Sequence, residues 1–130
     1  MRNRIRFRNE RGQTMTEFAL VLPILAVLLF GVIQFGIVFN NYVTLTDAVR
    51  AGARKGAVGR FSSTPANDVQ TAVKNSAGGL DQAQINITVN SSWTPGADVS
   101  VTATYPYSIS LLGWVVKSGR LSSTTTERVE

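Results

Sequence analysis

The chain has 130 residues, of which 44% are apolar, and a net charge of +5, which suits one small domain, either soluble or membrane-anchored. It contains no cysteine and no histidine, so disulfides, thiol chemistry, haem ligation, Cys/His zinc sites and a Ser-His-Asp triad are all excluded. Its eight acidic residues are scattered singly rather than clustered as metal ligands, and we therefore expect no catalytic site, no metal and no cofactor.

Residues 1–12 form a short basic leader. Their net charge is +4, and excess arginine beside a membrane span marks the cytoplasmic side, so the carboxyl-terminal 90 residues are expected outside. Residues 13–130 contain eight basic and seven acidic residues, and this nearly balanced charge indicates no nucleic-acid partner. The leader has one acid, Glu10, and five arginines: Arg2, Arg4, Arg6, Arg8 and Arg11.

Residues 18–39 carry no charge and predict one membrane span. At ~1.5 Å per residue they reach roughly 33 Å, about the thickness of the hydrocarbon layer. The apolar core of a cleaved secretory signal is shorter, about 7–15 residues, and is followed directly by small residues. Pro23 removes a backbone donor within the span and should kink or loosen the helix there.

The helical pattern continues past the span, because small or apolar residues recur every three or four positions. We expect one helix over about 14–58, near 68 Å at ~1.5 Å per residue, within a region assigned to 13–58. Ala48, Gly52 and Gly56 form a row of small residues that allows close approach of another backbone. Either the chain's own outer domain or a neighbouring subunit could pack there. The apolar or small face contains Val38, Tyr42, Leu45, Val49, Gly52 and Gly56.

Residues 59–130 are expected to form an extracytoplasmic α+β domain. Thr64 as N-cap and Pro65 at the first helical position predict a short helix to about Ser76. Alternating apolar residues then predict two strands, 84–90 and 99–105, joined by a turn at 94–98 into a hairpin with one wet face. The residues expected to point inward are Val69, Ala72, Val73, Ile85, Ile87, Val89, Val99, Val101, Ala103 and Tyr105.

The tail divides into two pieces. Residues 109–116 are apolar but too short to span a membrane, and residues 121–130 are β-prone enough for a third strand. Trp114, with Leu111 and Leu112, could contact the core, the membrane surface or a partner, and a core position is the default expectation. The predicted fold is therefore α+β: a long N-terminal helix lying on a small antiparallel sheet.

Glu17 stands at the threshold of the apolar run. A carboxylate within hydrocarbon costs about 2.5–3.5 kcal/mol on insertion scales, so this residue needs a partner or a place at the membrane edge. A simple explanation is an interfacial glutamate at a helix start, where the helix dipole favours an anion.

The surroundings of Glu17 suggest a second explanation. Gly12 precedes it by five positions, after a short basic leader, and the apolar run follows from Phe18. This arrangement resembles a type IV prepilin signal. The resemblance implies cleavage after Gly12 by a prepilin peptidase, Gln13 as the new amino terminus, and Glu17 with Phe18 as assembly residues. In a bundle of apolar helices, Glu17 would then pair with a neighbour's terminal ammonium and set the register.

Residues 11–57 also resemble the TadE-like family, pilin-like pseudopilins of the tight-adherence (Tad/Flp) pilus system. The matching elements are RGQ before EFALVLP, the pair FG at residues 30–31 and 35–36, and AVRAGAR at 48–54. The chain departs from the family at three positions. Family members often carry an acid where this chain has Gln34 or Ala51, and an arginine near the position of Ile37. Gln34 is therefore expected to hydrogen-bond across helices or to lie near the outer headgroups.

The resemblance implies a minor pilin or pseudopilin that supports assembly of an adhesive pilus. It would be a single-pass protein of the bacterial cytoplasmic membrane with its N-terminus inside, and it could enter an extracellular filament. Its partners would be the prepilin peptidase, other pilins and pseudopilins, the pilus assembly machinery and membrane lipid. The alternative is an unprocessed, membrane-anchored domain that binds an extracellular ligand, and the mass of the mature chain separates the two.

Overall fold

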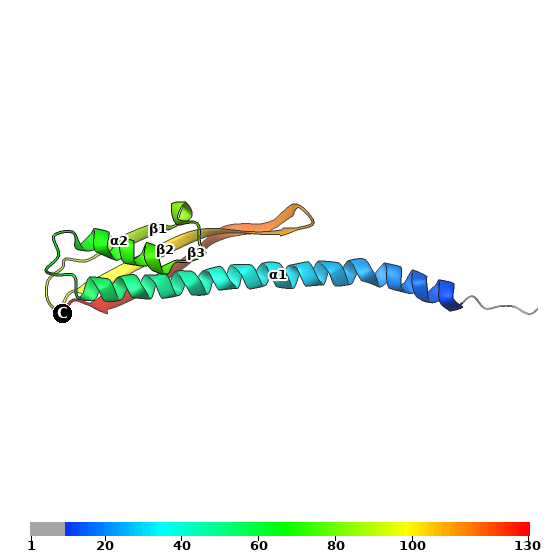
Figure 1. Cartoon of the computed structure of the whole chain (residues 1–130), viewed down its shortest axis with the longest axis horizontal. Helices are drawn as coiled ribbons and strands as arrows, with labels where there is room; N and C mark the ends of the chain where they lie inside the picture. The colour runs from blue at the N-terminus through cyan, green and yellow to red at the C-terminus, as the bar shows by residue number, and fades with distance from the viewer. Residues whose placement is uncertain (1–9) are drawn as a thin grey trace, which may run out of the picture.

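The computed structural model describes residues 10–130 and shows a long helix with a small domain on its C-terminal half (Figure 1). The predicted leader, residues 1–12, lies mostly outside the described residues. The predicted α+β fold, a long apolar helix with a second helix and a small antiparallel sheet, is confirmed. The elements are α1 (Glu10–Ala57), α2 (Pro65–Ser76), a 3-10 helix (Gln82–Gln84), β1 (Asn86–Asn90), β2 (Asp98–Leu111) and β3 (Trp114–Arg128).

Helix α1 is one unbroken helix of 48 residues, about 72 Å long at ~1.5 Å per residue. It includes the whole predicted apolar run and continues into the domain. Pro23 lies inside it, and α1 bends in its blue N-terminal segment in Figure 1. Proline accounts for a bend because it removes one backbone hydrogen bond and crowds the preceding turn.

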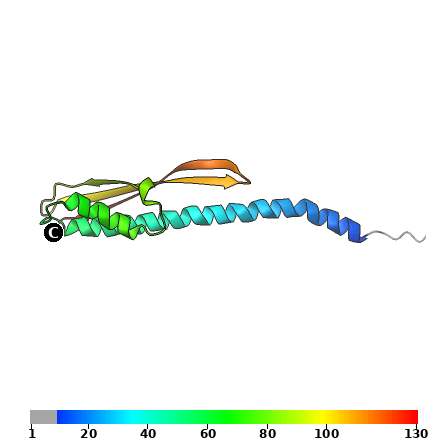
Figure 2. The same ribbon diagram turned by 45° about the horizontal axis from the view of Figure 1, so that its top comes forward.

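The sheet has the strand order β1-β2-β3, and both pairs are antiparallel. Helices α1 and α2 lie on the same face of it, α1 against β2 and β3 and α2 beside β1 (Figures 1 and 2). The other face is polar: the hydroxyls of Thr102 and Thr124 lie 2.8 Å apart, and Arg120 donates to Thr104 at 3.1 Å. This two-layer arrangement explains the predicted alternation, since every second residue of β2 points toward the helices.

The core lies between the two helices and the sheet. The chain end closes it, because Val129 is buried and its amide donates to the Ala97 carbonyl at 2.8 Å, while the Glu130 amide donates to the Ala57 carbonyl at 2.9 Å. The buried apolar residues are Leu45, Ala48, Val49, Ala53, Val69, Val73, Ala77, Leu80, Ile85, Val99, Val101, Ala103 and Val129.

One expectation is wrong: residues 109–116 do not join the core. Strands β2 and β3 continue as a two-stranded ribbon past α2 and β1, with Leu112 and Gly113 in the turn. Trp114 is 81% exposed and Leu112 is 73% exposed. The ribbon leaves the core because its strands, of 14 and 15 residues, are longer than β1 and α2, of 5 and 12 residues, which pack beside them. The predicted third strand is present but begins at Trp114 rather than at Leu121.

Candidate functional site

The residues of the predicted processing site lie in the first turns of α1. Gln13 and Glu17 are one turn apart, and the Gln13 Nε2 donates to the Glu17 Oε1 at 3.0 Å. Thr16 Oγ1 donates to the Gly12 carbonyl at 2.9 Å. These four residues are all exposed, so this region is open to an enzyme or to a neighbouring chain.

The Gly12–Gln13 peptide bond is in helical conformation. A peptidase binds its substrate as an extended stretch of backbone, so cleavage here requires the first turns of the helix to unwind locally. Glycine within a helix is destabilising by roughly 0.5–1 kcal/mol relative to alanine. Gly12 therefore makes this opening easier at the position where the resemblance predicts cleavage.

Beyond Phe18, α1 has an uncovered apolar surface. In the part of the chain that the structure describes, one helix, Gly12–Ala57, is long and apolar enough to cross a membrane. None of its most apolar window is buried within the chain. The rings of Phe35 and Phe39 stack on each other, with centroids 6.5 Å apart, rather than on another element. These side chains need an apolar environment that the chain itself does not supply.

The C-terminal half of α1, in contrast, is covered by the chain's own domain. The three small residues of the predicted row, Ala48, Gly52 and Gly56, are all buried. A Cβ on Gly52 would collide with Val73 of α2, and a Cβ on Gly56 would lie 2.8 Å from Val99 Cγ2 of β2. Of the two alternatives for this row, the structure shows packing against the chain's own domain.

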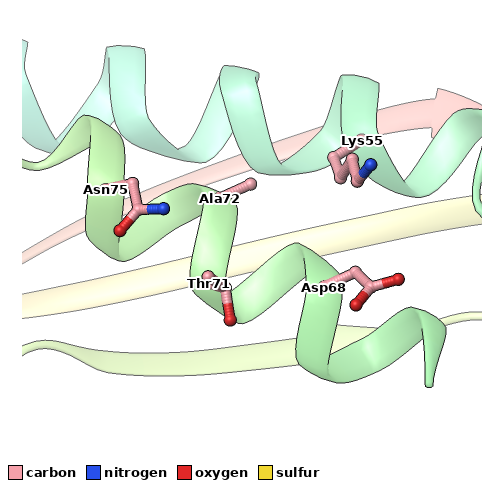
Figure 3. A pocket seen from close by; sticks show the side chains of 5 residues that line it. All are labelled: Lys55, Asp68, Thr71, Ala72 and Asn75. Carbon is pink, nitrogen blue, oxygen red and sulfur yellow. The ribbon is translucent and has the colours of Figure 1, made fainter.

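A shallow pocket of about 290 Å³ lies where α2 meets α1. Figure 3 shows Lys55 reaching toward it from α1, while the other lining residues, Asp68, Thr71, Ala72 and Asn75, come from α2. The Asp68 carboxylate accepts a hydrogen bond from Ser62 Oγ at 2.5 Å. One amine and one carboxylate can bind a polar group, but they do not form a nucleophile with its base. Among the described residues, no group of three or more acidic side chains could hold a metal ion.

Among the described groups outside the membrane segment, the Asp81 carboxyl has a perturbed pKa. Hydrogen bonds from the Gln84 side chain and then from the Ala83 amide lower the pKa of Asp81 below its ordinary value. Both partners belong to the 3-10 helix that Asp81 caps. The shift therefore reports a local cap rather than a reactive carboxylate.

The sequence leaves three environments open for Trp114, Leu111 and Leu112, and the default among them, the core, is wrong, since Trp114 and Leu112 are exposed. A signal for a hairpin is present: Gly113 interrupts an apolar stretch with β-prone residues on both sides, which is typical of a hairpin turn. The core is the default because large apolar residues are usually buried.

Comparison with known proteins gives one relevant similarity. The model of the family described as TadE-like protein matches residues 12–54, from Gly12 to the buried part of α1. The resemblance to the TadE-like family is thus confirmed over this segment, and it supports a protein associated with the Tad pilus. No curated protein and no solved structure matches the chain.

Proposed function

We propose, from this TadE-like segment, that the chain is a minor pilin or pseudopilin that a prepilin peptidase cuts after Gly12 and that supports assembly of a Tad/Flp-type adhesive pilus. The observation that carries the proposal is the N-terminal half of α1. It combines a glycine that follows a short basic leader, a glutamate at the fifth position after it, and an apolar helix that the chain leaves uncovered. The role is structural and not enzymatic.

The protein is anchored with its N-terminus in the cytoplasm and its domain outside. The basic leader supports this orientation through the positive-inside rule. In this state α1 lies in lipid. In the assembled pilus, the helices of neighbouring subunits replace lipid around the same apolar surface, so the uncovered half of α1 serves both states.

Glu17 sets the register of assembly. In the unprocessed helix it accepts a hydrogen bond from Gln13, one turn earlier. Cleavage turns Gln13 into the chain end and gives it an ammonium group, which adds to the positive end of the helix dipole. A neighbour's Glu17 that meets this ammonium is neutralised, whereas a misplaced subunit leaves two unpaired charges in an apolar bundle.

The processing step can be tested by coexpressing the full chain with a prepilin peptidase. The wild-type chain should begin at Gln13, and Gly12→Leu should remain full-length because the bulky side chain blocks the cleavage position. Gly31→Leu, in an open part of α1, is the matched control and should be cut normally. N-terminal sequencing and intact mass give the readout. Recovery of only full-length wild-type chain beside an active peptidase would favour the unprocessed, membrane-anchored binding domain instead.

A further inference from the structure

The end of the β2–β3 ribbon, residues 109–116, is here called the hairpin tip. It extends past the domain alongside α1 and points toward the N-terminal half of that helix, as the two views agree (Figures 1 and 2). No described element covers its apex. The large apolar residues exposed on it are Leu112, Trp114, Val115 and Val116.

The hairpin tip reaches the level of the predicted membrane span. Val99, near the start of β2, packs at Gly56 of α1, so helix and strand can be measured from there. At ~3.3 Å per residue, β2 advances about 43 Å from Val99 to Leu112. The same distance along α1 corresponds to about 29 residues at ~1.5 Å each. The apex therefore lies beside the middle of the uncharged residues 18–39, and Figure 1 shows the ribbon running alongside α1 to that level.

The apolar residues of the hairpin tip are not confined to one face. Leu111 pairs with Trp114 and Ser110 with Val115, and neighbouring pairs point to opposite faces of the ribbon. Leu112 forms the apex between them. A protein partner that docked on one side would need one apolar face, whereas apolar groups on both faces and at the apex suit a surrounding solvent of lipid.

Charge also favours lipid over a protein core. Residues 99–126 contain two cations, Lys117 and Arg120, and no acid. The cations follow directly behind the apolar hairpin tip on β3, and Tyr107 lies at a similar distance from the apex on β2. Aromatic and basic residues behind an apolar end are typical of a segment at the headgroup layer of a membrane.

The turn itself keeps an apolar residue in an unfavourable position. Leu112 has φ 51° and Gly113 has φ 86°, and two-residue turns with two positive φ values favour Asn-Gly. A residue such as leucine in this conformation costs roughly 1–2 kcal/mol. Because Leu112 is exposed, no contact within the chain offsets the strain. An apolar environment outside the chain would do so.

We propose that the hairpin tip is a second membrane contact, which inserts into the leaflet on the domain's side of the membrane that α1 spans. The apolar apex enters the acyl chains, while the ribbon behind it stays nearer to the headgroup layer, because its open edges carry amide groups that need water or headgroups. Lys117 and Arg120 extend toward anionic headgroups. The proposal goes beyond the proposed function and requires only that α1 spans the membrane.

The test uses the full chain in lipid nanodiscs that contain anionic lipid, with one copy of the chain in each disc. Since the chain has no cysteine, a spin label can be placed singly at Val115→Cys, and at Phe61→Cys in the far loop as the matched control. Electron paramagnetic resonance then compares accessibility to oxygen, which enters lipid, with accessibility to a water-soluble nickel chelate. The proposal predicts a several-fold higher oxygen-to-nickel ratio at residue 115 than at residue 61.

Equal ratios at the two sites would overturn the proposal. So would protection of residue 115 only when discs hold several copies, because the occupant would then be a second copy of the chain. Leu112→Asn provides a second variant that should fold at least as well, since Asn-Gly suits the turn. It should lower the ratio at residue 115, and an unchanged ratio would count against insertion of the apex. Flotation of the chain with vesicles is measured separately. If the chain does not float, α1 does not anchor it in the membrane. If it floats but residue 115 has no lipid contact, only the inference about the hairpin tip is wrong.

Discussion

Residues 18–39 and residues 45–57 of α1 belong to one continuous helix but meet different surroundings. In the first region nearly every large side chain is exposed, for example Leu20 at 70% and Val32 at 71%. In the second region Leu45, Ala48, Val49 and Ala53 are fully buried against α2 and the sheet. One helix can therefore present two surfaces, one covered within the chain and one left exposed.

The sequence of each region explains its surface. The first region is apolar all round, which is typical of a helix surrounded by apolar material. The second region is apolar or small on one face and carries its charges elsewhere, such as Arg50, which lies 3.5 Å from Asp47 on the exposed side. The stability of the folded domain should therefore depend on the second region and not on the first.

The largest expected effect comes from a charge in the buried region. Leu45→Asp places an unpaired carboxylate in the core and should destabilise the domain by about 3–5 kcal/mol, enough to unfold many small domains. Thermal unfolding of the detergent-solubilised chain, followed by near-ultraviolet circular dichroism, measures the change. The matched control is Leu28→Asp, at an exposed position of the same helix, which should weaken membrane insertion but leave domain unfolding unchanged. Equal destabilisation by both variants would refute the division of α1.

A smaller effect is expected when one methyl group is added to a glycine. Gly52→Ala and Gly56→Ala each introduce a Cβ against valine side chains and should destabilise the domain by about 1–3 kcal/mol. Gly31→Ala and Gly36→Ala, in the first region, have nothing within 4 Å of the added Cβ. Because alanine also favours helix, these two controls should be neutral or slightly stabilising. Denaturant unfolding of the four variants checks this, and wild-type stability of Gly52→Ala would show that α2 can move aside.

The smallest expected effect is a dependence of stability on acidic pH at Asp81, outside both regions of α1. Its pKa is lowered in the folded state, so its contribution is present above the pKa of the unfolded chain and is lost as pH falls through the lower folded value. Asp81→Asn should flatten this part of the pH profile of unfolding. Since the group is fully exposed, a profile that changed strongly would indicate a partner other than the cap of the 3-10 helix.

The parts of the fold that follow from local pattern could be predicted from sequence. The bounds of α1 and α2 could be predicted within a few residues. They follow from the apolar run, the spacing of three and four residues after it, and Pro65. The length of β2 and β3 could not, because Ser108 and Ser110 interrupt the apolar pattern and only strand pairing extends the ladder through them. The exposure of Trp114 depends on how far the ribbon extends past α2 and β1, which is a tertiary feature. The roles of Gly12, Gln13 and Glu17 come from resemblance and stay predictions.

If the uncovered half of α1 is built for assembly, with Glu17 as its register residue, then a change at Glu17 alone should block assembly and leave insertion and processing intact. Cells that express wild-type chain or Glu17→Gln are fractionated, the membrane chain is sequenced from its N-terminus, and sheared pili or crosslinked assembly complexes are analysed for the same chain. The account predicts that Glu17→Gln reaches the membrane in normal amount and begins at Gln13, yet is missing from pili and complexes. Assembly of Glu17→Gln at the wild-type level would contradict it and leave Glu17 as an interfacial helix-start residue.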